Sequence, residues 1–596
     1  MASLSTVHRV SIRETRTHLV HVETTLADPG GLPESLVVYM AVWTPGSYLV
    51  REYARHVEGL SASAPARATK IRKNAWRIET GGAPRVEVRY RVYANELTVR
   101  TSHVDETHAF LVGAALFLGI DGREDTPARI EIVCPPGWRV ATALPAAAGG
   151  ADPSVIHRFD APDFETLIDS PIEIGTHREE RFSALGKVHR YAIWPPGSVG
   201  DADARRLVDD TRAIVETEAK LFGGTLPYGA YDFLLHLSQR ARGGLEHRAS
   251  AALIASPSSF STREAYLDLL SLVAHELLHA WNVKRIRPAG LVPYRYGEEC
   301  YTRLLWWFEG ATSYYDWRVL ALARLCTIDE YLDHLSGEIA YLEQTPGRLV
   351  HSLEEASYDA WIKLYRPDEN SANSSVSYYR NGEVVCALLD LEIRFRSGGR
   401  SSLDRILSIL WEQYGAVDQP VPENAMQAVF ERAAGAPMGD LFDAWIRSPA
   451  EIDYGPAFAR VGLGLERSAR ADAPPCSLGL RVRSEAGRTV VATVLRESSA
   501  WRAGVDPGDE LVAVGGTRIE GTNVEAALRG RAPGEGVDVV LVRDGRLLTR
   551  GAHLDPPRHD RIKLVALRDA PPNDREAFTA WLGEPHPAWV SREGAS

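Results

Sequence analysis

The sequence is poor in cysteine and lacks the cysteine spacings of a scaffold or a metal knuckle. The 596 residues include an odd number of widely separated cysteines: Cys134, Cys300, Cys326, Cys386 and Cys476. This usage excludes a small disulfide-stabilised domain and a paired-cysteine metal site. A reducing compartment fits it best.

Long hydrophobic runs are also missing. No stretch approaches the roughly 20 apolar residues of a membrane span, and the N-terminal segment has no apolar core of signal-peptide length. We therefore predict a cytoplasmic protein without a membrane span. A periplasmic or secreted location stays open if a leader has been removed.

An excess of basic residues is absent as well. The formal net charge is -12, and Lys and Arg are scattered along the chain, which argues against nucleic acid as a partner. The only local basic cluster, "NVKRIRP" at 282–288, is interpreted as a solvated helix end. With 45% hydrophobic and 24% charged residues, the composition is typical of a folded globular protein.

The chain is long enough for about three or four domains, and its patterns predict a multidomain α+β protein. Residues 1–182 are predicted to form an antiparallel β domain, because segments such as "VEVRYRVY" at 86–93 alternate apolar and charged residues. Residues 183–456 are predicted to be mostly helical, beginning with a helix from Asp201 to the pair Gly223-Gly224 and a strand at 231–238. Short strands and glycine turns then predict a separate module at 457–560, followed by an extension at 561–596.

The most informative segment is "SLVAHELLHAWNVKRIR" at 271–287, which places polar groups in an apolar helical pattern. The predicted helix starts at a capping box of Ser261 and Glu264 and ends before Pro288. His275 and His279 are four residues apart, so both can reach one ion about 2.0–2.1 Å away. Glu276 lies beside the open position of that ion, where it can accept a proton from water. The alternative is a pair of buried histidines bonded to backbone.

A third metal ligand is predicted in "LLWWFEGATSYYDW" at 304–317, where Glu309 interrupts an apolar run. Glu309 would complete a site for one zinc ion per chain, with water as the fourth ligand. Its alternative role is a buried ion pair with an arginine. Asp316 lies seven residues further on, where it can hydrogen-bond a ligand histidine or be solvated.

Two more segments carry candidate substrate-binding groups. "ARGGLEHRAS" at 241–250 places Glu246 beside Gly243 and Gly244, where glycines let a substrate backbone approach and a carboxylate can hold an ammonium group. A turn with a solvated glutamate is the alternative. Tyr378 and Tyr379 precede a long apolar helix, and a phenol near a metal can donate to a developing oxyanion, although tyrosines also serve as packing residues.

Several of these segments together resemble a known family. "HELLHAWNVKRIRP", "LLWWFEGATSYY", "GGLEH", "SLEEASYDAWIKLYRPDENSANSSVSYYRNGEV" and, in the first domain, "WTPGSYLVREY" are similar to the glycyl aminopeptidase family of zinc gluzincins that carry a PDZ domain. The resemblance implies a thermolysin-like catalytic domain at 183–456. It also implies a preference for small N-terminal residues, Gly or Ala.

The wider aminopeptidase N group resembles this family, and its motifs imply roles for the matching residues of this chain. GGLEH stands where that group has GAMEN, which implies Glu246 as the amine anchor, although Leu245 and His247 depart from the pattern. YRNG stands where it has YEKG, which implies Tyr379 rather than Tyr378 as the oxyanion donor. Glu309 lies 30 residues past His279, a longer connection than in aminopeptidase N.

The C-terminal module is similar to a PDZ domain. "CSLGLRV" at 476–482 resembles a carboxylate-binding loop, with Leu478, Gly479 and Leu480 as backbone donors, and "TNVEAALRG" at 522–530 resembles the groove helix. Such a module can capture a peptide C-terminus by adding it as a strand, or it can be a packed accessory domain without a ligand.

The sequence therefore predicts a zinc-dependent aminopeptidase acting on peptides with a free N-terminus. Glu276 and Tyr379 are the predicted catalytic residues. Glu246, Gly243 and Gly244 would bind substrate, and His275, His279 and Glu309 would bind the metal. The alternatives are a zinc endopeptidase of other specificity and a non-catalytic protein that binds peptides through its PDZ-like module.

Overall fold

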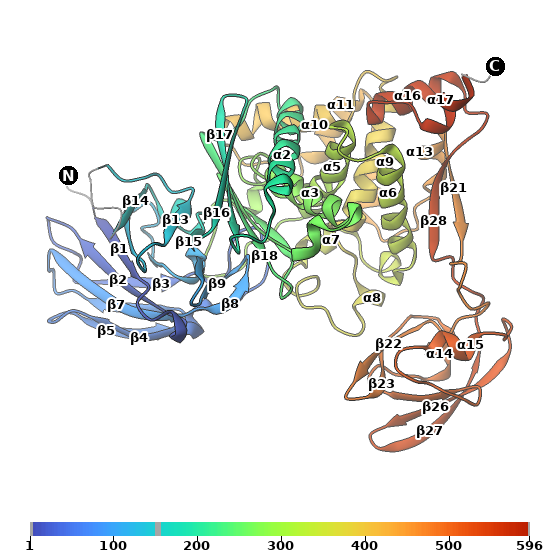
Figure 1. The fold of residues 1–596 in the computed structure, drawn as a ribbon, viewed down its shortest axis with the longest axis horizontal. Helices are drawn as coiled ribbons and strands as arrows, with labels where there is room; N and C mark the ends of the chain where they lie inside the picture. Colours follow the sequence, from blue (N-terminus) through green and yellow to red (C-terminus); the bar gives the residue numbers. More distant parts are fainter. Residues whose placement is uncertain (1–3, 149–155, 594–596) are drawn as a thin grey trace. The chain divides into compact units, whose positions relative to one another are not determined.

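The computed structural model describes residues 4–148 and 156–593 (Figure 1). The chain divides into two compact units. The first comprises Met1–Thr302, Tyr315–Leu325 and Leu407–Glu423, and the second comprises Arg303–Tyr314, Cys326–Ile406 and Asn424–Ser596. Within the described residues, no helix has the length and apolar character needed to cross a membrane.

Three sheets build the N-terminal part of the first unit, drawn in blue to teal in Figure 1. The first has the order β14 (His157–Ala161), β12 (Ala128–Val133), β1 (Ser5–Ser11), β2 (Leu19–Ala27), β7 (Arg85–Tyr93), β4 (Val57–Ala62). The second has the order β13 (Arg139–Thr142), β15 (Ile172–Gly175), β10 (His108–Leu111), β9 (Thr101–Val104), β8 (Asn95–Thr98). The third has the order β11 (Leu118–Ile120), β3 (Ser35–Met40), β6 (Ala75–Glu79), β5 (Arg67–Arg72). The pairs are antiparallel except β1 with β12, which is parallel.

A fourth sheet carries the strand that bears Glu246. Its order is β16 (Arg178–Ala184), β17 (Lys187–Trp194), β18 (Ala230–Leu237), β20 (Ser250–Ala255), β19 (Gly243–Glu246). Helices α2 (Asp201–Leu221) and α3 (Arg263–Leu278) contact this sheet. Leu234, Leu245 and Ile254 pack into the same hydrophobic core as the N-terminal sheets. The core therefore fixes β19 against the N-terminal β domain.

Helices dominate the second unit before residue 460. They are α4 (Leu305–Phe308), α6 (Ile328–Glu343), α7 (Leu353–Tyr358), α8 (Ser371–Ser374), α9 (Arg380–Arg396), α11 (Met426–Ala434), α12 (Gly439–Phe442) and α13 (Gly455–Ala459). Helix α5 (Gly310–Leu322) begins in this unit, and α10 (Leu403–Gln413) has its first residues here.

The C-terminal residues of the second unit form two sheets. One has the order β22 (Leu480–Glu485), β23 (Arg488–Val494), β24 (Glu510–Val514), β26 (Gly536–Arg543), β27 (Arg546–His553), with β25 (Thr517–Arg518) paired to β24. Helices α14 (Ser499–Ala503) and α15 (Val524–Leu528) belong to the same module. Outside it, β21 (Leu463–Ser468) pairs with β28 (Arg561–Ala566), and α16 (Pro572–Leu582) and α17 (Pro587–Glu593) follow.

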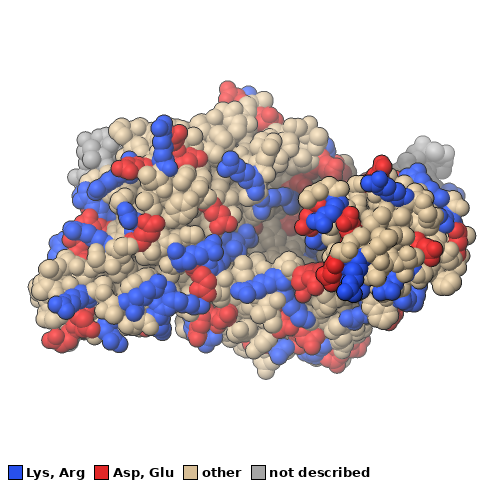
Figure 2. Space-filling model, turned by 90° about the horizontal axis from the view of Figure 1, so that it is seen from below, with Lys and Arg blue, Asp and Glu red and all other residues tan. Residues whose placement is uncertain are grey.

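The predicted fold class, a multidomain α+β protein, is confirmed. The alternation at 86–93 belongs to β7, in which Val86, Val88, Tyr90 and Val92 are buried. The predicted strand at 231–238 is β18, and the helix that starts at Asp201 ends just before Gly223-Gly224. On the face shown in Figure 2, Lys and Arg are interspersed with Asp and Glu, so this face carries no large patch of one sign.

Two details of the sequence interpretation are wrong. The N-cap of α3 is Thr262, whose side chain accepts a hydrogen bond from the Ala265 amide, and not Ser261. The basic cluster at 282–288 is not a solvated helix end, because Lys284 is only 5% exposed and forms an ion pair with Asp169. Helix α3 ends at Leu278, well before Pro288.

Candidate functional site

The two histidines of the HELLH segment lie at the C-terminal end of α3, and each has one ring nitrogen fixed by a hydrogen bond. His275 Nδ1 lies 3.1 Å from Asp316 Oδ2, and His279 Nδ1 lies 2.7 Å from the Asn282 carbonyl oxygen. A carbonyl can only accept, so Nδ1 of His279 is protonated and donates. An outer hydrogen bond at Nδ1 is typical of histidines that bind a metal through Nε2, and the two ring centroids are 4.8 Å apart.

Glu276 is 5% exposed and packs directly under β19. A Cβ atom added to Gly244 would lie 1.9 Å from Glu276 Oε1, so only glycine leaves room for this carboxylate. The sequence interpretation gave Gly244 a different role, close approach of substrate. One ligand atom from each of Glu246, Glu276 and His279 lies within 4.8 Å of the others. The structure therefore brings the predicted base and the predicted amine anchor together beside a histidine of the HELLH motif.

The Glu246 carboxylate is 3% exposed, and its buried Oε1 has no hydrogen-bond partner within the described residues. Gly46 lies against it, with φ of +87°, and a Cβ atom there would lie 2.4 Å from both carboxylate oxygens. A buried, unsatisfied carboxylate is costly unless a cation pairs with it. The buried carboxylate therefore suits the binding of a cationic ligand.

A buried ion network supports the segment next to Glu246. Asp169 accepts hydrogen bonds from Lys284 Nζ at 2.6 Å and from the Arg248 amide at 2.7 Å, and its Oδ1 lies 3.2 Å from His247 Nδ1. Although burial opposes it, the Asp169 carboxylate, and to a smaller extent Glu246, raises the pKa of Lys284 above its usual value. Lys284 is therefore charged, and it fixes the loop that follows Glu246.

Helix α2 adds a buried carboxyl group that sequence reasoning missed. Glu218 is fully buried, and neither carboxyl oxygen has a hydrogen-bond partner in the part of the chain that the structure describes. Burial, followed by the negative charge of Asp316, raises the pKa of Glu218 well above its usual value. Its position on the buried face of a long amphipathic helix, where an apolar residue is expected, was the only signal in the sequence.

In the second unit, Glu309 follows α4 and is 2% exposed. Tyr379 is the N-cap residue of α9, and its hydroxyl lies 3.2 Å from that of Tyr365. Burial, followed by the charge of Glu309 and the phenol of Tyr365, raises the pKa of Tyr379 well above its usual value. Tyr379 is therefore a protonated hydrogen-bond donor near the Glu309 carboxylate.

The two tyrosines differ in exposure. Tyr378 is fully buried and stacks on Tyr379 with ring centroids 4.8 Å apart, whereas Tyr379 keeps some exposure. The start of α5 packs closely against the start of α9, since a Cβ atom on Gly310 would lie 2.6 Å from the Gly382 Cα atom. These contacts favour Tyr379, rather than Tyr378, as the phenol that can reach a substrate.

The donor set fits a zinc ion. His275 and His279 of the first unit offer imidazole nitrogens, and Glu309 of the second unit offers a carboxylate oxygen. Two imidazole nitrogens and one carboxylate oxygen are the ligands of many catalytic zinc sites, which keep a further position for water. Asp316 provides the outer hydrogen bond that such a histidine ligand commonly makes.

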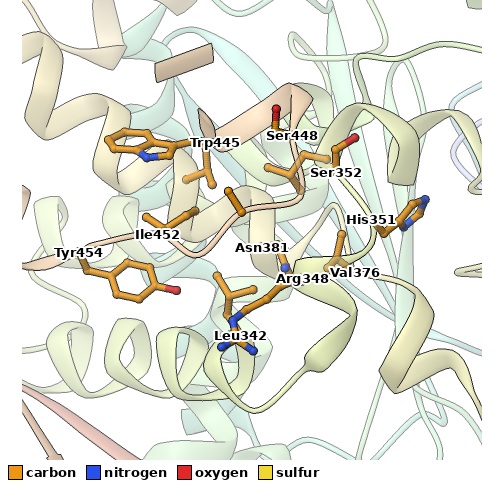
Figure 3. Close-up of a pocket in the computed structure, with 13 residues that line it drawn as sticks. Leu342, Arg348, His351, Ser352, Val376, Asn381, Trp445, Ser448, Ile452 and Tyr454 are labelled. Carbon is orange, nitrogen blue, oxygen red and sulfur yellow. The ribbon is translucent and has the colours of Figure 1, made fainter. Parts of the chain in front are cut away.

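A small cavity lies in the second unit, away from the predicted site residues. It has a volume of about 30 Å³ and is lined by side chains that include Arg348, Asn381, Trp445 and Tyr454 (Figure 3). None of the predicted site residues lines this cavity.

Three family models match the chain. Residues 8–176 match the Peptidase M61 N-terminal domain, residues 268–385 match M61 glycyl aminopeptidase, and residues 476–552 match a PDZ domain. No curated protein matches the sequence.

Solved structures also resemble the chain. An aminopeptidase N family protein from Idiomarina loihiensis is 28% identical, with a TM-score of 0.89 over 97% of this chain and 100% of that one. An M1 zinc metallopeptidase from Deinococcus radiodurans is 14% identical, with a TM-score of 0.47 over 76% of this chain and 96% of that one. The N-terminal and catalytic regions thus match models of M61 peptidases and the C-terminal module matches a PDZ domain, so the chain is a metallo-aminopeptidase with a PDZ domain that is similar to the M61 glycyl aminopeptidases.

Proposed function

We propose that the chain removes the N-terminal residue of peptides at a single zinc ion bound by His275, His279 and Glu309. The observation that carries the proposal is the convergence of Glu276, Glu246 and His279, whose ligand atoms lie within 4.8 Å of one another. A general base and an amine-binding carboxylate beside one metal ligand suit hydrolysis of the first peptide bond.

Helix geometry supports Glu309 as the third ligand. Glu309 immediately precedes α5, and Asp316, on the same helix, lies seven residues further on. Seven residues are about two helical turns, so both side chains lie on one face. Because Asp316 hydrogen-bonds His275, that face of α5 is turned towards the histidines.

When bound, zinc would polarise the scissile carbonyl and lower the pKa of a water molecule towards 7. Glu276 accepts the proton of the attacking water and passes it to the leaving amine. Tyr379 donates a hydrogen bond to the oxyanion that forms on the carbonyl oxygen. Glu246 binds the α-ammonium group of the substrate and thereby fixes the first peptide bond at the base.

The proposed substrates have a small first residue, Gly or Ala. The support is the match of residues 268–385 to M61 glycyl aminopeptidase and the narrow space around Glu246, which Gly46 closes on one side. Hydrolysis of the 4-nitroanilides of Gly, Ala and Leu would rank the residues. The proposed specificity predicts that kcat/KM falls from Gly or Ala to Leu.

Metal analysis and two substitutions test the mechanism. Glu276→Gln should abolish turnover while one zinc ion per chain is retained. Glu246→Gln should lower kcat/KM for free-amine substrates by about 10- to 100-fold, because a hydrogen bond to a charged group contributes about 1.5–3 kcal/mol. Glu264→Gln is the matched control, since Glu264 is an exposed carboxylate on the same helix α3.

Two results would contradict this function. Activity that survives Glu276→Gln would refute the assigned base. Unchanged cleavage of free-amine substrates by Glu246→Gln, together with cleavage inside N-acetylated peptides, would instead indicate an endopeptidase.

We also propose that the PDZ domain binds a peptide C-terminus along β22. The support is the position of β22 at the edge of its sheet and the left-handed Gly479, with φ of +70°, in the preceding loop. Fluorescence anisotropy with labelled peptides, free or amidated at the C-terminus, tests this. Equal binding of both forms would refute carboxylate capture.

A further inference from the structure

A second cluster of metal-binding side chains lies in the first unit, apart from the proposed active site. His108 on β10, Glu173 on β15 and His236 on β18 are 0%, 0% and 1% exposed. His108 Nδ1 lies 3.2 Å from Glu173 Oε1, and His236 Nε2 lies 2.9 Å from Glu173 Oε2. One ligand atom from each of the three lies within 4.8 Å of the others.

The spacing of these atoms suits a bound cation. Ligands about 2.0–2.1 Å from a tetrahedral zinc ion are about 3.4 Å apart, and wider coordination brings neighbouring ligands closer. The two separations of 3.2 Å and 2.9 Å lie near these values. Each histidine nitrogen thus lies as close to an oxygen of Glu173 as a neighbouring ligand of one ion would.

The charge of Glu173 needs a partner. Within the described residues, its side chain makes hydrogen bonds only with His108 and His236, and no Lys or Arg forms an ion pair with it. A fully buried carboxylate is costly without a cation. A divalent cation bound by all three groups would compensate the charge of this carboxylate.

The histidine rings are held in place before any ligand binds. Trp194 stacks on His108 with centroids 3.8 Å apart and an interplanar angle of 14°. Phe110 packs edge-on against His236 at 4.8 Å. Rings fixed by packing lose little freedom on coordination, as a preorganised metal site requires.

A further donor lies beside the cluster. His103 is 6% exposed, its Nε2 lies 3.1 Å from Asp105 Oδ2, and its Nδ1 has no hydrogen-bond partner within residues 4–148 and 156–593. Its ring centroid is 5.2 Å from that of His108. One nitrogen bound to a carboxylate and the other left open is an arrangement that suits a metal-ligating histidine.

We propose that His108, Glu173 and His236 bind a second divalent cation of the zinc type, with His103 as the nearest further donor. The site is structural and joins β10 and β15 of the N-terminal β domain to β18 of the fourth sheet. His236 and Gly243 pair with the same residue, Ile254, from opposite sides of β20. The cation therefore braces the sheet whose edge strand carries Glu246.

Metal counting on the full chain tests this site independently of the proposed active site. The protein is reconstituted with zinc, freed of excess metal by gel filtration and analysed by mass spectrometry. We expect two zinc ions per chain in the wild type and one in His279→Ala. We expect one in Glu173→Gln, and none in the double variant.

A matched control and a second measurement keep the test decisive. His189→Gln removes a buried histidine that contacts the Tyr228 hydroxyl but no carboxylate, and it should keep both ions. If Glu173→Gln does not fold, Co²⁺ is titrated into His279→Ala, where an absorption spectrum of nitrogen and oxygen ligands at one equivalent is expected. A wild type with one ion and a metal-free His279→Ala that gives no cobalt spectrum would overturn the proposal. Such results would leave the proposed active site intact.

Discussion

Replacing Gly244 with alanine should displace the proposed base without disturbing the backbone. Gly244 lies in strand β19 outside the left-handed region, so alanine fits its conformation. The new Cβ atom would lie 1.9 Å from Glu276 Oε1, whereas ordinary van der Waals contact starts near 3.4 Å. The carboxylate must therefore move by about 1.5 Å. Since a misplacement of about 1 Å can cost about 100-fold, we expect kcat to fall by about 100-fold, or about 2.7 kcal/mol of activation free energy.

The assay is hydrolysis of an alanine 4-nitroanilide, with zinc content and melting temperature measured on the same samples. Gly229→Ala is the matched control, because Gly229 has an ordinary φ and no atom within 4 Å of an added Cβ. Zinc content should stay at the wild-type value in both variants, because the three atoms nearest to the Cβ added at Gly244 all belong to Glu276. If kcat of Gly244→Ala stays within twofold of that of Gly229→Ala, Glu276 in this position is not the base.

Three further outcomes are expected. Gly46→Ala should raise KM about tenfold, because the added Cβ atom pushes the Glu246 carboxylate away. The control is Gly59→Ala, since Gly59 has a similar left-handed φ but no atom within 4 Å of an added Cβ. Equal KM values for the two variants would refute the contact between Gly46 and Glu246. Asp316→Ala should weaken zinc binding about 10- to 100-fold in a chelator competition, because His275 loses its orienting hydrogen bond; unchanged affinity would contradict this role. Burial lowers the pKa of His8 from 6.5 to about 4. Between these two pH values the unfolded chain binds a proton at His8 that the folded chain does not bind. The free energy of unfolding should therefore fall by about 3 kcal/mol as the pH drops from 6.5 to 4. His8→Gln should reduce that loss in denaturant titrations at pH 7.5 and 4.5, and an unaltered pH dependence would count against it.

The periodicity of apolar residues along the chain was sufficient to predict several strands and helices. Strand β7 and helix α2 follow directly from the alternation at 86–93 and from the amphipathic run that begins at Asp201. The start of α3 was misplaced by one residue because Ser261 and Thr262 are both good caps, and only the hydrogen bond to the Ala265 amide distinguishes them. Within one element, sequence patterns limit such errors to the ends.

Burial of charged groups depends on partners that are distant in the sequence. Lys284 lies in a basic run that is typical of a solvated surface, yet it is buried against Asp169, 115 residues earlier. Glu246 was identified from its motif, but its contact with Gly46 joins segments 200 residues apart. No local pattern encodes such a contact, because the energy that selects it comes from tertiary packing.

The turn that follows α3 also has a conformation that local sequence patterns do not predict, and this turn orients a proposed zinc ligand. His279 is the C-cap of α3, and its Nδ1 donates to the carbonyl of Asn282 in the turn that follows. The next residue, Val283, has φ of +118°, a conformation that a β-branched side chain adopts only under constraint. Propensity alone would place glycine there. Because buried Trp281, Lys284 and Ile286 hold both sides of this turn, the strained backbone persists and keeps the carbonyl on His279. The orientation of this proposed zinc ligand therefore depends on packing around a residue that takes no part in the chemistry.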